Sequence, residues 1–243
     1  IPLVTHRITL ISRFQTWTQP LWLPLNLLPF VVIAWKTPGA FSDWTGFAGS
    51  LGAGGDDFNL LFFGAAASVV FALVPQIGEQ VDFLRFLPRR RDSLSQRTSW
   101  WVALFAAGPG WIVLGVAKML AGSFLLFLVL QEMVPMEHAT EPMRMYLSAF
   151  DKVFVSPAWA LAAAGTLVIV AQLKINVTNA YAGSIAWSNF FARLTHSHPG
   201  RVVWVAFNTL IALMLMELNV FQALGKVLGL YSNIAISWMM AVV

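Results

Sequence analysis

Residues 161–194 read LAAAGTLVIVAQLKINVTNAYAGSIAWSNFFARL, and they are the most informative stretch of the chain. The stretch begins as an ordinary membrane helix, which is small and apolar as far as Ala171. It continues without a break in helical character, but polar side chains then stand where lipid-facing residues would be expected. These are Gln172, Lys174, Asn176, Thr178, Asn179, Tyr181 and Ser184. Polar groups at this depth are costly unless they meet protein partners, water or a ligand, so they predict a functional site.

Three amides in this stretch share one helical face. Gln172, Asn176 and Asn179, followed by Gly183, are spaced at i, i+4, i+7 and i+11. We predict that the three amides bind a solute that crosses the bilayer. The alternative is that they hydrogen-bond to neighbouring helices, as polar side chains do in many membrane bundles.

The composition predicts an all-α, polytopic membrane protein. Hydrophobic residues make up 58% of the 243 residues and charged residues only 11%, whereas about 25% is usual in soluble proteins. The eleven tryptophans suit rings of aromatic residues at two membrane–water interfaces. The chain has no cysteine, which excludes disulfides, thiol nucleophiles and cysteine metal ligands.

A helix needs about 20 mostly apolar residues to cross a bilayer, and the sequence offers six such spans. They are residues 14–36, 58–78, 100–130, 157–191, 202–218 and 227–243. The third and fourth exceed one bilayer thickness, so we expect them to be tilted, broken or flanked by interfacial helix. We treat residues 1–243 as a single transmembrane domain. Because the chain opens at Ile1 and closes in an apolar run, we expect it to be a piece of a longer protein.

The loops between the spans alternate in charge. One side carries most of the arginines, in residues 1–13, 79–99 and 192–201, and the other side mixes lysine with many acidic residues. The positive-inside rule places the arginine side in the cytoplasm, which predicts a multi-pass protein of the bacterial inner membrane. The sequence pI of about 9.8 follows from these loops, so we expect the lipid bilayer, and no nucleic acid, as a partner.

Two stretches outside the spans are predicted to lie on the outer side. Residues 37–57 are rich in glycine and are expected to form a flexible loop. Residues 132–156 are expected to hold a short amphipathic helix along the membrane surface.

Residues 79–91, EQVDFLRFLPRRR, close the second span and carry part of a resemblance. Nucleobase–cation symporters, the family of cytosine, purine, allantoin and hydantoin permeases, end their sixth helix in a Pro-Asp-aromatic-x-Arg-Phe motif. The segment resembles this motif, with Val81 in place of the proline. The matching residues are Asp82, Phe83, Arg85 and Phe86.

The fourth span resembles the eighth helix of the same family, in which an asparagine cluster is followed by an aromatic and small residues. The residues in these places are Asn176, Asn179, Tyr181, Gly183 and Ser184. Residues 13–33 look like the fifth helix of the family, and residues 217–233 like its ninth-to-tenth turn. The resemblance implies that the chain covers about helices five to ten of a LeuT-type inverted-repeat fold.

In that fold the binding site lies near the membrane midplane, where helices are interrupted. The second span contains Pro75, which removes a helical donor and frees a carbonyl beside a cavity. The resemblance implies that Ala72, Leu73, Gln76 and Tyr181 line the solute site. It also implies an inner-end cap or gate formed by Asp82 and Arg85.

The chain departs from the family at two places. No tryptophan lies between Trp44 and Trp100, although family members stack the flat base on a tryptophan of the sixth helix. Lys174 stands near the place of the oxygens that bind sodium in coupled members, with Thr178 one turn further on. We predict that Lys174, with Thr178, replaces the coupling cation, so that coupling is to protons or absent. The alternative for Lys174 is that it reaches to an interface.

We therefore expect a secondary-active transporter, a permease for a small nitrogenous, nucleobase-like solute. The alternative is a transporter-like sensory input domain of a larger membrane signalling protein. The sequence carries no motif of an enzyme or a cofactor site, so we predict neither. His196 and His198 are expected in a solvated loop and not at a metal site. The sequence leaves the solute, the coupling ion and the oligomeric state open.

Overall fold

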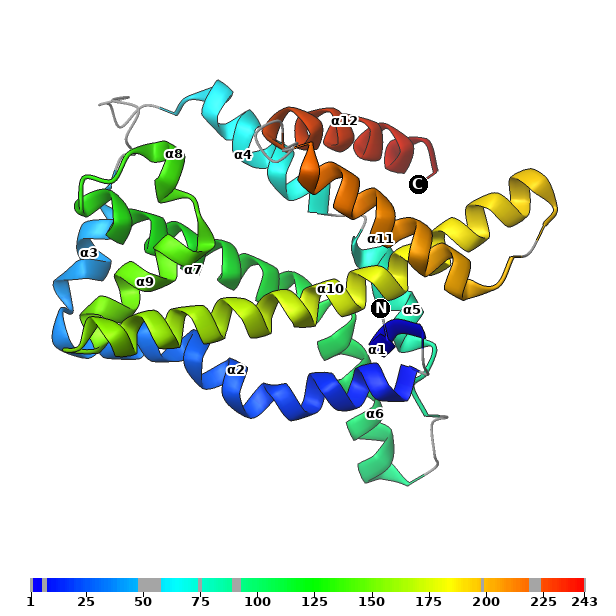
Figure 1. Ribbon diagram of the computed structural model, residues 1–243, viewed down its shortest axis with the longest axis horizontal. Coiled ribbons are helices and arrows are strands. Elements are labelled where there is room, and N and C mark those ends of the chain that lie inside the picture. Colours follow the sequence, from blue (N-terminus) through cyan, green and yellow to red (C-terminus); the bar gives the residue numbers. More distant parts are fainter. Residues whose placement is uncertain are drawn as a thin grey trace. The chain divides into compact units, whose positions relative to one another are not determined.

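The computed structural model describes residues 2–5, 8–47, 58–73, 76–88, 93–197, 199–218 and 224–242 (Figure 1). In these ranges all regular secondary structure is α-helical, which confirms the all-α prediction. The helices are α1 (Pro2–Thr5), α2 (Ile8–Lys36), α3 (Gly39–Thr45), α4 (Leu60–Leu73), α5 (Gln76–Leu84), α6 (Leu94–Ala107), α7 (Gly110–Gln131), α8 (Met136–Ala139), α9 (Pro142–Val153), α10 (Pro157–Thr195), α11 (Arg201–Glu217) and α12 (Leu224–Val242).

Three of the described helices, α2, α7 and α10, are long and apolar enough to cross a membrane. They overlap the first, third and fourth predicted spans, and each extends beyond its span at one end. The 39 residues of α10 form one unbroken helix of about 58 Å at 1.5 Å per residue, which is longer than a bilayer is thick. Helices α11 and α12 correspond to the fifth and sixth predicted spans.

The third predicted span is divided in the structure, and the second is described on both sides of residues 74 and 75. The third span is broken between α6 and α7, where Gly108 has a non-helical backbone and Pro109 has no N–H to donate. A side chain at position 108 would lie 2.9 Å from the Leu104 carbonyl oxygen, so glycine is required for this bend. The second span consists of α4, which ends at Leu73, and α5, which begins at Gln76.

The prediction of a flexible loop at residues 37–57 is wrong for the part that forms α3. Aromatic packing explains this helix, because the Phe41 ring stacks on Phe124 of α7 at 4.3 Å between ring centres. Trp44 also contacts Phe124, and its ring N–H donates a 2.8 Å hydrogen bond to Ser123. Residues 48–57 lie outside the described part of the chain. The predicted helix within residues 132–156 is confirmed as α9, which α8 precedes.

The chain forms two compact units, which are described separately. Unit 1 comprises residues 1–54 and 117–208, and unit 2 comprises residues 55–116 and 209–243. In unit 2, α4 packs along α12 and α5 meets α6. The prediction of a single transmembrane domain stays a prediction.

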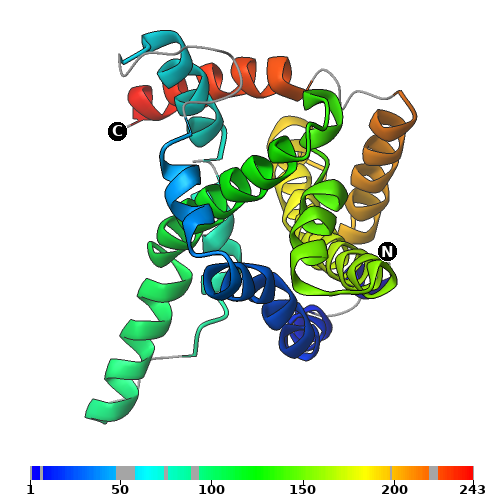
Figure 2. The same cartoon turned by 90° about the vertical axis from the view of Figure 1, so that its left-hand side faces the viewer.

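In unit 1, α2 and α10 run antiparallel side by side, and α9 packs against both (Figures 1 and 2). The small side chains of Ala160 and Ala164 let α10 approach its neighbours closely. Together with Leu167 and Phe150 they form a buried cluster, against which Trp22 of α2 packs. This close contact between α2 and α10 positions the polar groups of the candidate site.

Candidate functional site

Lys174 lies on the buried side of α10, and only 9% of its surface is exposed. The other buried positions of this helix recur at helical spacing, and they are Ala160, Ala164, Leu167, Val177, Tyr181, Ala182 and Ser184. Lys174 is the charged member of this stripe, so its ammonium must be satisfied within the protein.

The ammonium of Lys174 donates to three oxygens of α2. The Lys174 Nζ lies 2.9 Å from the Gln15 carbonyl oxygen, 3.0 Å from Thr18 Oγ1 and 3.2 Å from Gln19 Oε1. The Thr18 hydroxyl donates its own hydrogen to the Phe14 carbonyl at 2.8 Å, so a lone pair is left for the ammonium. All three ammonium hydrogens therefore have an acceptor.

The backbone carbonyl of Lys174 also links the two helices. It accepts a 3.0 Å hydrogen bond from Gln15 Nε2, so Gln15 and Lys174 contact each other in both directions. Thr178 donates its hydroxyl to the same carbonyl at 3.2 Å and to the Ile175 carbonyl at 2.9 Å. Thr178 is thus joined to Lys174 through the backbone of α10.

An indole ring completes the surroundings of Lys174. Its Nζ lies 5.5 Å from the centre of the Trp22 ring, within the range of a cation–π interaction. Lys118 of α7 lies 5.8 Å from the centre of the same ring. Lys174 is thus buried and bonded to α2, and the alternative that it reaches to an interface stays a prediction.

The acceptors around the Lys174 ammonium are neutral oxygens: a carbonyl, a hydroxyl and a side-chain amide. No carboxylate of the described residues forms an ion pair with it. Such oxygens are also the ligands that hard cations take from proteins, so the ammonium occupies a cation-binding environment. Without a carboxylate, the positive charge of Lys174 is not neutralised within this site.

Sequence reasoning missed Gln15, Thr18 and Gln19 as members of the site. Their spacing of i, i+3 and i+4 places three polar side chains on one face of a largely apolar helix. The same spacing argument that singled out the amides of residues 172–179 could have found them.

Polar contacts of α2 also reach α9, through Asn26 and Tyr146. Asn26 donates to the Trp22 carbonyl at 2.8 Å, and its side-chain oxygen accepts a 3.1 Å hydrogen bond from the Tyr146 hydroxyl. Burial raises the pKa of the Tyr146 phenol, because the charged form is poorly solvated there.

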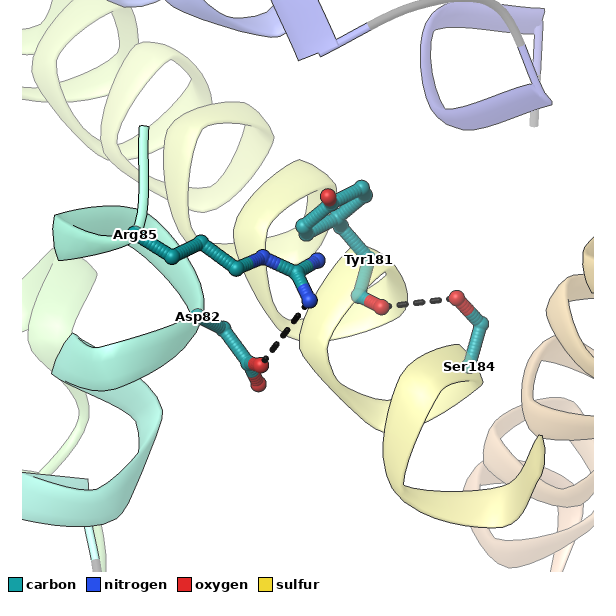
Figure 3. Close-up of polar contacts among 4 residues, drawn as sticks. All are labelled: Asp82, Arg85, Tyr181 and Ser184. Atoms are coloured by element: carbon teal, nitrogen blue, oxygen red, sulfur yellow. Dashed lines mark hydrogen bonds and ion pairs between the residues drawn. The ribbon is translucent and has the colours of Figure 1, made fainter. Parts of the chain in front are cut away.

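The three predicted solute-binding amides lie on a different side of α10. Gln172, Asn176 and Asn179 are all exposed, and none has a hydrogen-bond partner among the described residues. The structure does not bring these amides together with Tyr181, whose surface is only 2% exposed. The guanidinium of Arg201 lies 5.3 Å from the centre of the Tyr181 ring, and Ser184 donates a 2.7 Å hydrogen bond to the Tyr181 carbonyl (Figure 3).

The predicted gate residues lie at the C-terminal end of α5. Asp82 and Arg85 form an ion pair with 3.9 Å between Oδ1 and Nη1 (Figure 3). The Arg85 guanidinium also lies 5.0 Å from the centre of the Phe86 ring. Both charged side chains are partly exposed, so the pair is weak as a structural element.

Three predicted residues lie at the facing ends of α4 and α5. Ala72 and Leu73 end α4, and Gln76 begins α5, but their side chains lie outside the described part of the structure. Pro75 and His198 also lie outside it. The described residues include no cluster of three or more His, Asp or Glu that could hold a metal ion.

Comparisons with protein-family models, with curated proteins and with solved structures found no match to this chain.

Proposed function

We propose that this chain is part of a secondary-active transporter for a small nitrogenous, nucleobase-like solute, built on a LeuT-type inverted repeat. The observation that carries the proposal is the pair of polar faces on α10. One face holds an ammonium against α2, and the other exposes amides that have no partner among the described residues.

The exposed amides supply the solute contacts. In lipid, an unpaired amide costs several kcal/mol, so Gln172, Asn176 and Asn179 must meet water or a ligand in a membrane-spanning helix. An amide has both donors and acceptors in one plane, which matches the N–H and C=O groups on the edge of a nucleobase. This chemistry favours a flat, neutral, nitrogen-rich solute over an ion.

The Lys174 ammonium replaces the cation that sodium-coupled transporters of this fold bind. Two unit charges about 4 Å apart repel by roughly 4 kcal/mol at an effective dielectric of about 20, which is about three powers of ten in affinity. Sodium is therefore kept out of the oxygens around Lys174. Transport is driven by protons or runs down the gradient of the solute.

Uptake by the intact protein in proteoliposomes tests the amide face. With radiolabelled uracil, hypoxanthine and allantoin as probes, we expect saturable uptake by the unmodified protein. Asn176→Ala and Asn179→Ala should each weaken the affinity by about tenfold or more, since a hydrogen bond to the solute is lost. Asn189→Ala, which removes an exposed amide of α10 outside this face, is the matched control and should leave uptake unchanged.

The outcomes separate the proposed function from its alternatives. Unchanged affinity in both amide variants would reduce the face to helix–helix contacts. Binding of a probe without uptake would favour the sensory input domain. A strong difference between sodium and choline buffers in the unmodified protein would overturn the role of Lys174.

A further inference from the structure

Unit 1 contains a cavity of about 530 Å³ that is separate from the Lys174 site. It lies where α3, the C-terminal end of α7 and the C-terminal end of α9 meet. The volume falls within the range of about 300 to 1,000 Å³ that is usual for pockets that bind small molecules.

The cavity wall carries one charge of each sign. Asp43 of α3 and Lys152 of α9 both line it. No ion pair joins them, and neither side chain has a hydrogen bond or an ion pair with another described residue. Thr37 and Gln131 add a hydroxyl and an amide to the same wall.

The rest of the wall is apolar and aromatic. Phe47 and Phe127 line the cavity, and their rings meet edge to face with 5.3 Å between the ring centres. Two opposite charges beside an aromatic wall match a solute that has an ammonium, a carboxylate and an apolar body.

The elements that carry the two charges are held in place by contacts outside the cavity. The stack of Phe41 on Phe124 and the hydrogen bond from Trp44 to Ser123 fix α3, and therefore Asp43, on α7. The Lys36 ammonium donates to the Lys152 and Val153 carbonyls at 3.5 and 3.3 Å, so the end of α9 is tied to the end of α2. The helices that carry Asp43 and Lys152 are therefore positioned without a ligand, which lowers the cost of binding.

We propose that this cavity binds a small zwitterion of the amino-acid class, whose ammonium pairs with Asp43 and whose carboxylate pairs with Lys152. The apolar part of the zwitterion packs on Phe47 and Phe127. This site goes beyond the proposed function, because it uses none of the residues assigned to the transported solute and takes a ligand of a different charge type.

Calorimetric titration of the intact protein in detergent tests the proposal with three related probes. L-phenylalanine has both charges, N-acetyl-L-phenylalanine lacks the ammonium, and L-phenylalaninamide lacks the carboxylate. We expect the protein to bind L-phenylalanine and to bind each of the other two about ten- to hundredfold more weakly, since each has lost a charge-assisted hydrogen bond.

Two variants test which residue causes each preference for L-phenylalanine over its derivatives. Asp43→Asn should remove the preference over the N-acetyl compound, and Lys152→Met should remove the preference over the amide. Asp151→Asn, which changes an exposed carboxylate of α9 that does not line the cavity, is the matched control and should keep both preferences.

Asp43→Asn tests the contact with the ammonium, and Lys152→Met tests the contact with the carboxylate. If one variant misfolds, the other still tests the proposal. Absence of L-phenylalanine binding to the unmodified protein would overturn the proposal. Preferences that survive in the folded variants, or that are lost in Asp151→Asn as well, would also overturn it.

Discussion

The two polar faces of α10 differ in what surrounds them. On the buried face, Lys174 has three acceptors on α2, and every hydrogen of its ammonium is used. On the exposed face, Asn176 and Asn179 have no partner among the described residues. The difference teaches that a polar residue in an apolar helix need not mark a ligand site, because a neighbouring helix can supply all of its hydrogen-bond partners.

The largest expected effect is on the buried face. Lys174→Met should lower the free energy of unfolding by about 3 kcal/mol, because it removes the donor of three partly buried hydrogen bonds that join α10 to α2. Unfolding of the purified protein in mixed micelles measures this change. A loss below about 1 kcal/mol would mean that the contacts to α2 do not hold the helices together.

The next effect concerns the packing of α10 against α11. A Cβ at position 183 would lie 2.9 Å from Asn208 Nδ2 and 3.1 Å from its Cγ, while Asn208 accepts a hydrogen bond from Trp187 Nε1 at 3.3 Å. Gly183→Ala should therefore destabilise the protein by about 1–3 kcal/mol.

Gly165 is the matched control for Gly183, because a Cβ there would meet nothing within 4 Å. Gly165→Ala should leave stability unchanged or raise it by up to about 1 kcal/mol, since alanine is the better helix former. Equal effects of the two substitutions in the same unfolding measurement would contradict the close approach of Asn208.

A smaller effect is expected at the contact between Tyr146 of α9 and Asn26 of α2. Tyr146→Phe should cost about 1 kcal/mol through the lost hydrogen bond to Asn26. Because burial raises the pKa of Tyr146 above its usual value of about 10, the folded protein keeps the phenol proton where the unfolded chain loses it. The stability that the protonated, buried phenol of Tyr146 contributes is fully present below about pH 10. It is lost as the pH rises through the pKa of the folded state.

The free energy of unfolding, measured at pH 8 and near pH 11, checks whether deprotonation of Tyr146 destabilises the folded protein. The unmodified protein should lose more stability over this interval than Tyr146→Phe does. An equal loss in both proteins would assign the alkaline change to other groups.

The smallest effect on stability is expected on the exposed face. Asn176→Ala and Asn179→Ala should each change the free energy of unfolding by no more than about 0.5 kcal/mol, because no described contact is removed. If either variant unfolded as easily as Lys174→Met, the two faces of α10 would not differ in kind.

The sequence predicted the helical class and the long apolar helices, because both follow from hydropathy summed over many residues. From its length, the third span was expected to be tilted, broken or flanked by interfacial helix, but the position of the break at Gly108 and Pro109 was not predicted. The sequence also missed α3, since glycine-rich composition argued for a loop while the packing of Phe41 and Trp44 on Phe124 stabilises a helix. That packing joins residues about eighty positions apart, and no local pattern contains it.

The candidate site was likewise predictable in part from local sequence and in part only from tertiary contacts. Local spacing along one chain segment was enough to place polar groups deep in an apolar helix and to put the amides of residues 172–179 on one face. Whether each polar group is satisfied depends on a second helix more than 150 positions away in the chain, as in the bonds from Lys174 to Gln15, Thr18 and Gln19. Hydropathy and helical periodicity are sums over neighbours in sequence, whereas a hydrogen-bond partner is a neighbour in space. The buried role of Lys174 therefore emerged only when α2 was packed against α10, and the amides were found to have no partner among the described residues.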